Sequence, residues 1–238
     1  TVQGVCMMRN FPVKGLIALT LVSGLLAGCD KAEVATYPTL DRLTPGIFLE
    51  PDERAVLPPG MDLRPVYDKG INLTKASEGF VGNLYNDAAG YCTIAYGHLI
   101  KLARCDGTEP VEFRRGVSEP QGVELLREDM GTAKRAVLTA VKVDLTDGQY
   151  AALCDFVFNV GGGNFRKSTL LKVINAGKFQ EVAFQLRRWI KAGGRELPGL
   201  VTRREREIEL FFEGIGIPRA VPPDNMDLSP LDVRTGEM

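Results

Sequence analysis

The chain has 238 residues, of which 45% are hydrophobic and 25% are charged. A chain of this length and composition can bury one sizeable core or two modest ones, which excludes intrinsic disorder of the whole. The 29 basic and 30 acidic residues give a formal net charge of −1, so no global charge attracts the chain to nucleic acid or to an anionic surface. We expect a monomer with no nucleic-acid partner.

Residues 15–28 form an uncharged apolar stretch that follows Arg9 and Lys14. Its length is typical of a signal-peptide core and falls short of the roughly 20 residues that a membrane-spanning helix needs. The stretch ends in Leu-Ala-Gly-Cys, which resembles the lipobox of bacterial lipoproteins, where the cysteine is lipidated. We predict a signal peptide over residues 1–28, with residues 1–6 as a possible upstream extension, and a lipid anchor on Cys29.

Two other interpretations of residues 15–28 stay open. The segment is also similar to the weakly hydrophobic, uncleaved signal anchors of signal-arrest-release phage endolysins, and a buried helix is the third alternative. The first two interpretations both predict export, with the folded part tethered on the periplasmic side of a membrane. The true start codon and the identity of that membrane are left open.

The prolines divide the rest of the chain. Six of the 14 lie between residues 29 and 66, four lie in residues 214–238, and only three lie within residues 67–213. Proline-rich segments without apolar periodicity are typical of extended linkers. We therefore predict a tether over residues 29–66, a catalytic domain over residues 67–213 and a loose acidic tail over residues 214–238.

The predicted elements of the folded part are mostly helical. Asn72 is a candidate cap for a short helix that ends at Glu78, and residues 83–102 combine Gly, Asn and Asp turns with short apolar runs, as a β-hairpin does. Capping-box spacing predicts two further helices, from Ser118 to about Lys142 and from Thr146 onward. The remaining predicted helices cover about residues 168–175, 179–191 and 199–213. This order predicts an α+β fold with a small β-hairpin lobe, a mainly helical lobe and an active-site cleft between them.

Two carboxyl groups are separated by a turn, one near the end of a predicted helix and one on the predicted hairpin. Glu78 ends the short helix, Asp87 follows nine residues later, and Thr93 follows six residues after that. Glycoside hydrolysis uses two carboxyl groups across a cleft, one held protonated and the other ionised by different environments. The spacing alone is weak support, because most surface carboxylates are only solvated.

The surrounding sequence strengthens this hypothesis. The segment TKASEGFVGNLYNDAAGYCTIAYGHLI resembles the active-site region of phage-type lysozymes, glycoside hydrolase family 24, with their pattern Glu-x8-Asp-x5-Thr. LTDGQYAALCDFVFNVGGGNFRKSTLL and RRWIKAGGRELPGLVTRREREIELF continue the resemblance in the same order, so that it covers about residues 67–213. It implies a lysozyme-like fold and a muramidase that cleaves the β-1,4 bond between N-acetylmuramic acid and N-acetylglucosamine in peptidoglycan glycan strands.

The resemblance also implies a role for each residue of the pattern. Glu78 is expected to be the general acid, and Asp87 to stabilise positive charge on the sugar and, with Thr93, to orient the attacking water. Water attack inverts the anomeric configuration, whereas Asp87 as nucleophile retains it, and the sequence leaves both outcomes open. A lytic transglycosylase of the same fold and a non-catalytic peptidoglycan-binding lipoprotein are the alternative functions.

Four further positions follow from the resemblance. Leu99, Phe158 and Ser168 occupy positions that look like saccharide contacts in the family. Ala95 stands where the family usually has Gly, so we expect strain of about 1 kcal/mol if the hairpin needs a positive φ there.

The cysteines and a basic segment complete the predictions. Cys92 and Cys105 are close enough in the chain for a disulfide in an oxidising compartment. His98 with these cysteines lacks zinc-site spacing and a fourth ligand, so we expect no metal and no cofactor, and a structural role for His98. Residues 187–206 hold seven basic and two acidic side chains, which form either a patch for the anionic wall or a solvated helix face.

Overall fold

The structure, a computed structural model, describes residues 63–237, which belong to one compact unit. The predicted signal peptide, Cys29 and most of the predicted tether lie outside the described residues. Within the described range, none of the helices combines the length and apolar character needed to cross a membrane.

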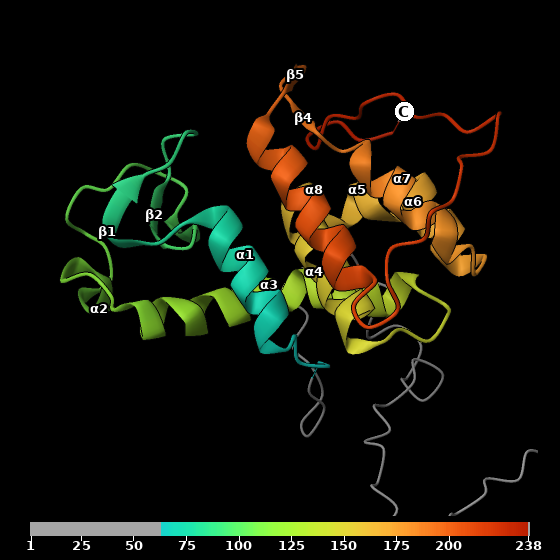
Figure 1. Cartoon of the computed structure of the whole chain (residues 1–238). Helices are drawn as coiled ribbons and strands as arrows, with labels where there is room; N and C mark the ends of the chain where they lie inside the picture. The colour runs from blue at the N-terminus through green and yellow to red at the C-terminus, as the bar shows by residue number, and fades with distance from the viewer. Residues whose placement is uncertain (1–62, 238) are drawn as a thin grey trace, which may run out of the picture. The chain divides into compact units, whose positions relative to one another are not determined.

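A small antiparallel sheet forms one part of the fold (Figure 1). Its strands β1 (Val81–Asn86), β2 (Cys92–Ala95) and β3 (His98–Lys101) lie in that order. The predicted hairpin is thus a three-stranded sheet. Every residue of β2 is buried, because β2 packs against the long helix α3 (Glu119–Ala140). Alternation between buried and exposed positions is therefore lost on this strand, and Thr93 is its one polar residue.

Ala95 has the positive φ that we expected to be strained for an alanine. Its φ is 58°, in the left-handed region, and its side chain is fully buried at the turn from β2 to β3. A β-carbon built on Gly122 of α3 would lie only 3.1 Å from Cβ of Ala95, so α3 approaches this turn closely. Close packing against α3 therefore holds a conformation that costs alanine about 1 kcal/mol.

His98 has the structural role that the sequence predicted. Its Nδ1 lies 3.0 Å from the carboxylate of Asp129 and thereby joins β3 to α3. The hydrogen bond to Asp129 raises the pKa of His98, although burial opposes the shift.

The helical body is built around α4 (Asp147–Val160). The capping boxes predicted at Ser118 and at Thr146 are both present, and they begin α3 and α4. α4 packs against α3, α1 (Asp68–Glu78) and α8 (Pro198–Phe211), and it is buried on nearly all sides. A helix enclosed on several sides needs apolar residues around most of its circumference, and α4 has them.

Helix α1 begins four residues before the predicted cap at Asn72. Tyr67 occupies the cap position without a side-chain hydrogen bond, so the sequence carries no capping signal there. A β-carbon on Gly70 would lie 2.7 Å from Cβ of Ala151 in α4. The missing side chain at Gly70 lets the first turn of α1 pack directly on α4.

The predicted helix over residues 179–191 is wrong from Arg188 onward. The chain forms a short 3-10 turn, η2 (Phe179–Glu181), and then α7 (Val182–Arg187), followed by an unpredicted hairpin of β4 (Lys191–Ala192) and β5 (Arg195–Glu196). Gly193 and Gly194 both have positive φ and form its turn. The structure adds α2 (Val111–Arg114) and α5 (Gly162–Lys167), whereas α6 (Thr169–Asn175) matches the prediction.

The tail differs from the predicted loose segment. Arg188, only 5% exposed, donates hydrogen bonds to Asp227 at 2.9 Å and to Glu237 at 3.2 Å. Asp232 forms a parallel bridge with Lys191, and the second carboxylate oxygen of Glu237 accepts from the backbone N–H of Thr169. Asp227 and Glu237 are thus counter-charges for a buried arginine, and residues 227–237 are docked.

A chain that ends at Pro223 should lose about 2 kcal/mol of unfolding free energy, because Arg188 then lacks both carboxylates. Urea unfolding measures this loss. Asp224→Asn, which changes an exposed acid of the same tail, is the control and should stay within about 0.5 kcal/mol of wild type. Equal stability of the truncated and full chains would contradict the docking of the tail.

Candidate active site

Glu78 lies where the helical body meets the sheet. It is the last residue of α1, and Gly79, with φ of 75°, ends the helix and turns the chain toward β1. Its side chain is 27% exposed, and Oε1 accepts a hydrogen bond from Nη1 of Arg203 at 2.8 Å. The carboxyl group is therefore accessible and yet fixed by one partner.

Arg203 of α8 connects this carboxyl group to the core. Its Nε and Nη2 donate to the two carboxylate oxygens of Asp155, each at 2.9 Å, and Asp155 is fully buried in α4. Burial lowers the pKa of Arg203, but the carboxylates of Asp155, Glu78 and Glu207 outweigh it and leave the pKa raised. The guanidinium thus stays charged and joins three helices at one point.

A second buried pair lies beside the first. Arg204 and Glu207 are both fully buried on α8, with Nη2 of Arg204 at 2.8 Å from Oε1 of Glu207. Arg204 also donates to Oδ1 of Asn159 and lies over the ring of Phe156. Burial raises the pKa of Glu207, against the attraction of Arg204, and burial lowers the pKa of Arg204.

Asp87 and Thr93 are held by the turn between β1 and β2. Oδ1 of Asp87 accepts from the backbone N–H groups of Ala89 at 2.9 Å and Tyr91 at 2.8 Å. The hydroxyl of Thr93 donates to the carbonyl oxygen of Tyr91 at 3.0 Å. Backbone groups of the same turn therefore orient both predicted side chains.

Tyr85 lies within electrostatic range of both predicted carboxylates, and the sequence alone did not single it out. It pairs directly with Thr93 across β1 and β2, so the two side chains share one face of the sheet. Its pKa is raised first by burial and then by the charges of Asp87 and Glu78. Tyr85 thus shares a face of the sheet with Thr93 and is close enough to Glu78 and Asp87 for both charges to act on its phenol.

The three predicted saccharide contacts have different surroundings. Leu99 of β3 pairs with Thr93 of β2 and is 46% exposed, so it lies beside a predicted catalytic residue. Phe158 is half-buried on α4. Ser168 is fully buried, donates to the carbonyl of Phe165 and accepts from the N–H of Leu171. We assign Ser168 to the cap of α6 and leave it out of the proposed site.

The basic segment 187–206 is partly buried. Arg203 and Arg204 are buried, Arg188 is covered by the tail, and Arg187 pairs with Glu205 at 2.7 Å. Three of the seven basic groups are thus buried and a fourth is paired at the surface, so the segment is not the continuous basic surface that one interpretation required.

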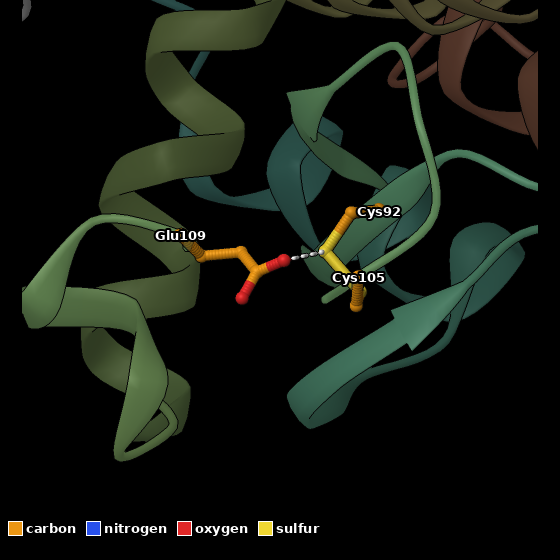
Figure 2. A group of neighbouring side chains, drawn as sticks. All are labelled: Cys92, Cys105 and Glu109. Atoms are coloured by element: carbon orange, nitrogen blue, oxygen red, sulfur yellow. Dashed lines mark hydrogen bonds between the residues drawn. A yellow bond between two sulfur atoms is a disulfide. The ribbon is translucent and has the colours of Figure 1, made fainter. Parts of the chain in front are cut away.

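The structure joins Cys92 and Cys105 in a disulfide beside Glu109 (Figure 2). These three side chains are the group within residues 63–237 whose ligand atoms are close enough for a metal ion. The two sulfurs are bonded to each other, and Glu109 binds Lys101 at 2.8 Å and two backbone N–H groups. The side chains are thus committed to one another and hold the loop after β3 against β2, the strand that carries Thr93.

Comparison with known proteins decides the family. The phage lysozyme family model matches residues 75–207. The chain belongs to the phage lysozyme family. It is 40% identical to an endolysin of Bacillus phage B103 over 147 residues, which are 61% of this chain and 53% of that relative. A SAR-endolysin of bacteriophage PS119 is 39% identical over 137 residues, 58% of this chain and 77% of the relative.

A solved structure agrees with this membership. The crystal structure of a point mutant of the lysozyme of phage P22 matches with a TM-score of 0.56 and 33% identity, over 63% of this chain and 99% of that one. The lysozyme-like combination of a small sheet with a mainly helical body is therefore confirmed, as is the enzyme class, a lysozyme that acts on peptidoglycan. The match to the Bacillus phage endolysin spans about half the length of that relative.

Arg203→Met should lower the unfolding free energy by about 3–5 kcal/mol, because it leaves the buried Asp155 carboxylate without its partner. Chemical denaturation measures the loss. Arg206→Met, an exposed arginine on the same helix, should stay within about 0.5 kcal/mol of wild type. A loss below about 1 kcal/mol in Arg203→Met would refute the role of this arginine in the fold.

Proposed function

We propose that the protein is a muramidase that hydrolyses the β-1,4 bond between N-acetylmuramic acid and N-acetylglucosamine and so degrades bacterial cell walls. The observation that carries this proposal is the placement of Glu78, an accessible carboxyl group at the junction of helical body and sheet, near Asp87 and Thr93. Glycoside hydrolysis needs such a pair of carboxyl groups on either side of the scissile bond.

Glu78 is the general acid in this proposal. Arg203 occupies Oε1, so Oε2 is the oxygen that holds the proton and delivers it to the glycosidic oxygen. The three-helix junction around Arg203 limits rotation of the Glu78 side chain. A fixed acid protonates the leaving group without first losing conformational freedom.

Asp87 and Thr93 act on the other side of the bond. The negative charge of Asp87 stabilises the positive charge that develops on the sugar ring. Thr93 gives its own hydrogen to the carbonyl of Tyr91, so its oxygen can accept a hydrogen bond from a water. This supports attack by a water molecule, which inverts the anomeric configuration, over attack by the Asp87 carboxylate.

Glu78→Gln should reduce the release of soluble fragments from purified peptidoglycan by at least about a hundredfold, since an amide cannot donate the proton. The amide oxygen can still accept from Arg203, so thermal unfolding should be nearly unchanged. Glu112→Gln removes the same charge from an exposed position and should retain wild-type activity. Full activity in folded Glu78→Gln would refute the assignment of Glu78 as the general acid.

We further propose that the protein is exported and held at a membrane through a lipid on Cys29. The lipobox-like sequence that ends at Cys29 supports a lipid anchor, and the relatives whose names include SAR-endolysin support export by a signal anchor as the competing arrangement. Either arrangement brings the enzyme to the wall side of a membrane, where its peptidoglycan substrate lies.

Growth with labelled palmitate tests this anchor. We expect label in the wild-type chain and none in Cys29→Ser, because the thiol is the acceptor of the lipid. Cys154→Ser, at a buried position of α4, is the matched control and should keep the label. An unlabelled wild-type chain, or label that persists in Cys29→Ser, would overturn lipidation and favour the signal anchor.

A further inference from the structure

A row of three paired side chains crosses the small sheet. Tyr85 of β1 pairs with Thr93 of β2, and Thr93 pairs in turn with Leu99 of β3. Directly paired residues of antiparallel strands project to the same face of the sheet. Thr93 and Leu99 are already predicted site residues, so Tyr85 is the member of the row that has no assigned role.

The row lies on the face of the sheet that points away from α3. His98 binds Asp129 of α3, and His98 pairs with Ile94, the residue after Thr93 on β2. Because successive side chains of a strand point to opposite faces, Thr93 and its partners point away from this contact. Leu99, at one end of the row, is 46% exposed. A ligand can therefore approach the row from this side.

The hydroxyl of Tyr85 has no use inside the described protein. The side chain is half-buried, yet within residues 63–237 its hydroxyl oxygen has no hydrogen-bond partner and is not enclosed. By contrast, the hydroxyl of Tyr96, just after β2, donates to Oε1 of Glu119 at 2.9 Å. A tyrosine hydroxyl in a largely apolar setting usually has a partner, so a free one beside Thr93 points to a ligand.

The phenol of Tyr85 is suited to donate a hydrogen bond. Burial and the negative charges of Asp87 and Glu78 raise its pKa, so the O–H group stays protonated. A phenol offers one O–H donor, and the hydroxyl and acetamido oxygens of a sugar are acceptors. Such a contact adds no charge to a site that already holds two carboxyl groups.

We propose that Tyr85 is a substrate-binding residue whose hydroxyl donates a hydrogen bond to an oxygen of the sugar that lies between Glu78 and Asp87. This inference rests on the proposed function, which places the scissile bond between these two carboxyl groups. Tyr85 and Leu99 then contact the glycan on either side of Thr93, one through a hydrogen bond and the other through apolar contact.

Calorimetric titration with a peptide-free glycan of three N-acetylglucosamine–N-acetylmuramic acid disaccharides tests this contact. The background is Glu78→Gln, so that the probe is not cleaved. Adding Tyr85→Phe should weaken binding about 5- to 10-fold, because one hydrogen bond is lost. It should leave thermal unfolding unchanged, because the hydroxyl has no partner among the described residues.

Tyr96→Phe in the same background is the matched control. It removes a hydroxyl that is bonded to Glu119, so it should lower the unfolding temperature and leave the affinity for the glycan unchanged. The two substitutions delete the same atom, and the predicted effects on stability and on binding are opposite.

Equal affinity with and without the Tyr85 hydroxyl would overturn the inference, as would a background protein that does not bind the glycan. A second measurement needs no substitution of Tyr85. The ring-carbon resonances of Tyr85 should shift when the glycan saturates Glu78→Gln, and unmoved resonances in the bound state would equally count against the contact.

Failure of the proposed function gives a different result. A wild-type chain that releases no soluble fragments from peptidoglycan contradicts the muramidase, whatever Tyr85→Phe does to binding. A chain that hydrolyses peptidoglycan but binds the glycan equally well without the hydroxyl contradicts only the role of Tyr85.

Discussion

The buried guanidinium of Arg203 is the interaction on which the rest of the structure depends. Its three donor nitrogens bind the carboxylates of Asp155 in α4 and Glu78 at the end of α1. The planar guanidinium binds Asp155 through two N–H groups and presents a third to Glu78, a forked geometry that a lysine ammonium does not offer. The close approach of α1 and α4 at Gly70 fixes the direction in which α1 delivers Glu78. The fold thus supports the proposed acid with the same contacts that hold its helices together.

The sheet carries the other residues of the candidate site, and contacts within the sheet and its turns hold them. Backbone groups around Tyr91 orient Asp87 and Thr93, and α3 covers the buried strand β2 that carries Thr93. The disulfide-bonded Cys92 directly precedes Thr93, and the strained Ala95 follows it on the same strand. Strain and a covalent link thus lie on either side of Thr93 and limit the movement of the hydroxyl that we propose to orient the attacking water. Rigid support around reacting groups is what gives an enzyme its preorganisation.

Much of the fold could be predicted from the sequence, because its signals are local. Both capping boxes begin helices where Ser118 and Thr146 indicate, and the Gly, Asn and Asp turns of residues 83–102 do form a small sheet. The early start of α1 and the docking of the tail could not be predicted in this way. They depend on Gly70 against Ala151 and on Arg188 with Asp227 and Glu237, contacts between segments far apart in the chain.

The charge network was missed for the same reason. The amino-acid sequence of residues 187–206 suggests a basic surface. The burial of Arg203 and Arg204 depends on how α8 packs in the folded protein, which the sequence does not show. One signal was available: Asp155 is an acid in the middle of the apolar stretch of residues 151–157, and a carboxylate that stays ionised when buried is stabilised by a cation or by hydrogen-bond donors. The sequence therefore indicates that Asp155 binds a basic side chain, but it does not indicate which arginine that is.

Mass spectrometry of the fragments released from purified peptidoglycan tests the central claim most directly. Hydrolysis with Glu78 as acid and a water held at Thr93 adds one water per cleaved bond, so the account predicts N-acetylmuramic acid at the reducing ends. Fragments that end in 1,6-anhydro-N-acetylmuramic acid, formed without added water, would contradict it and show a lytic transglycosylase.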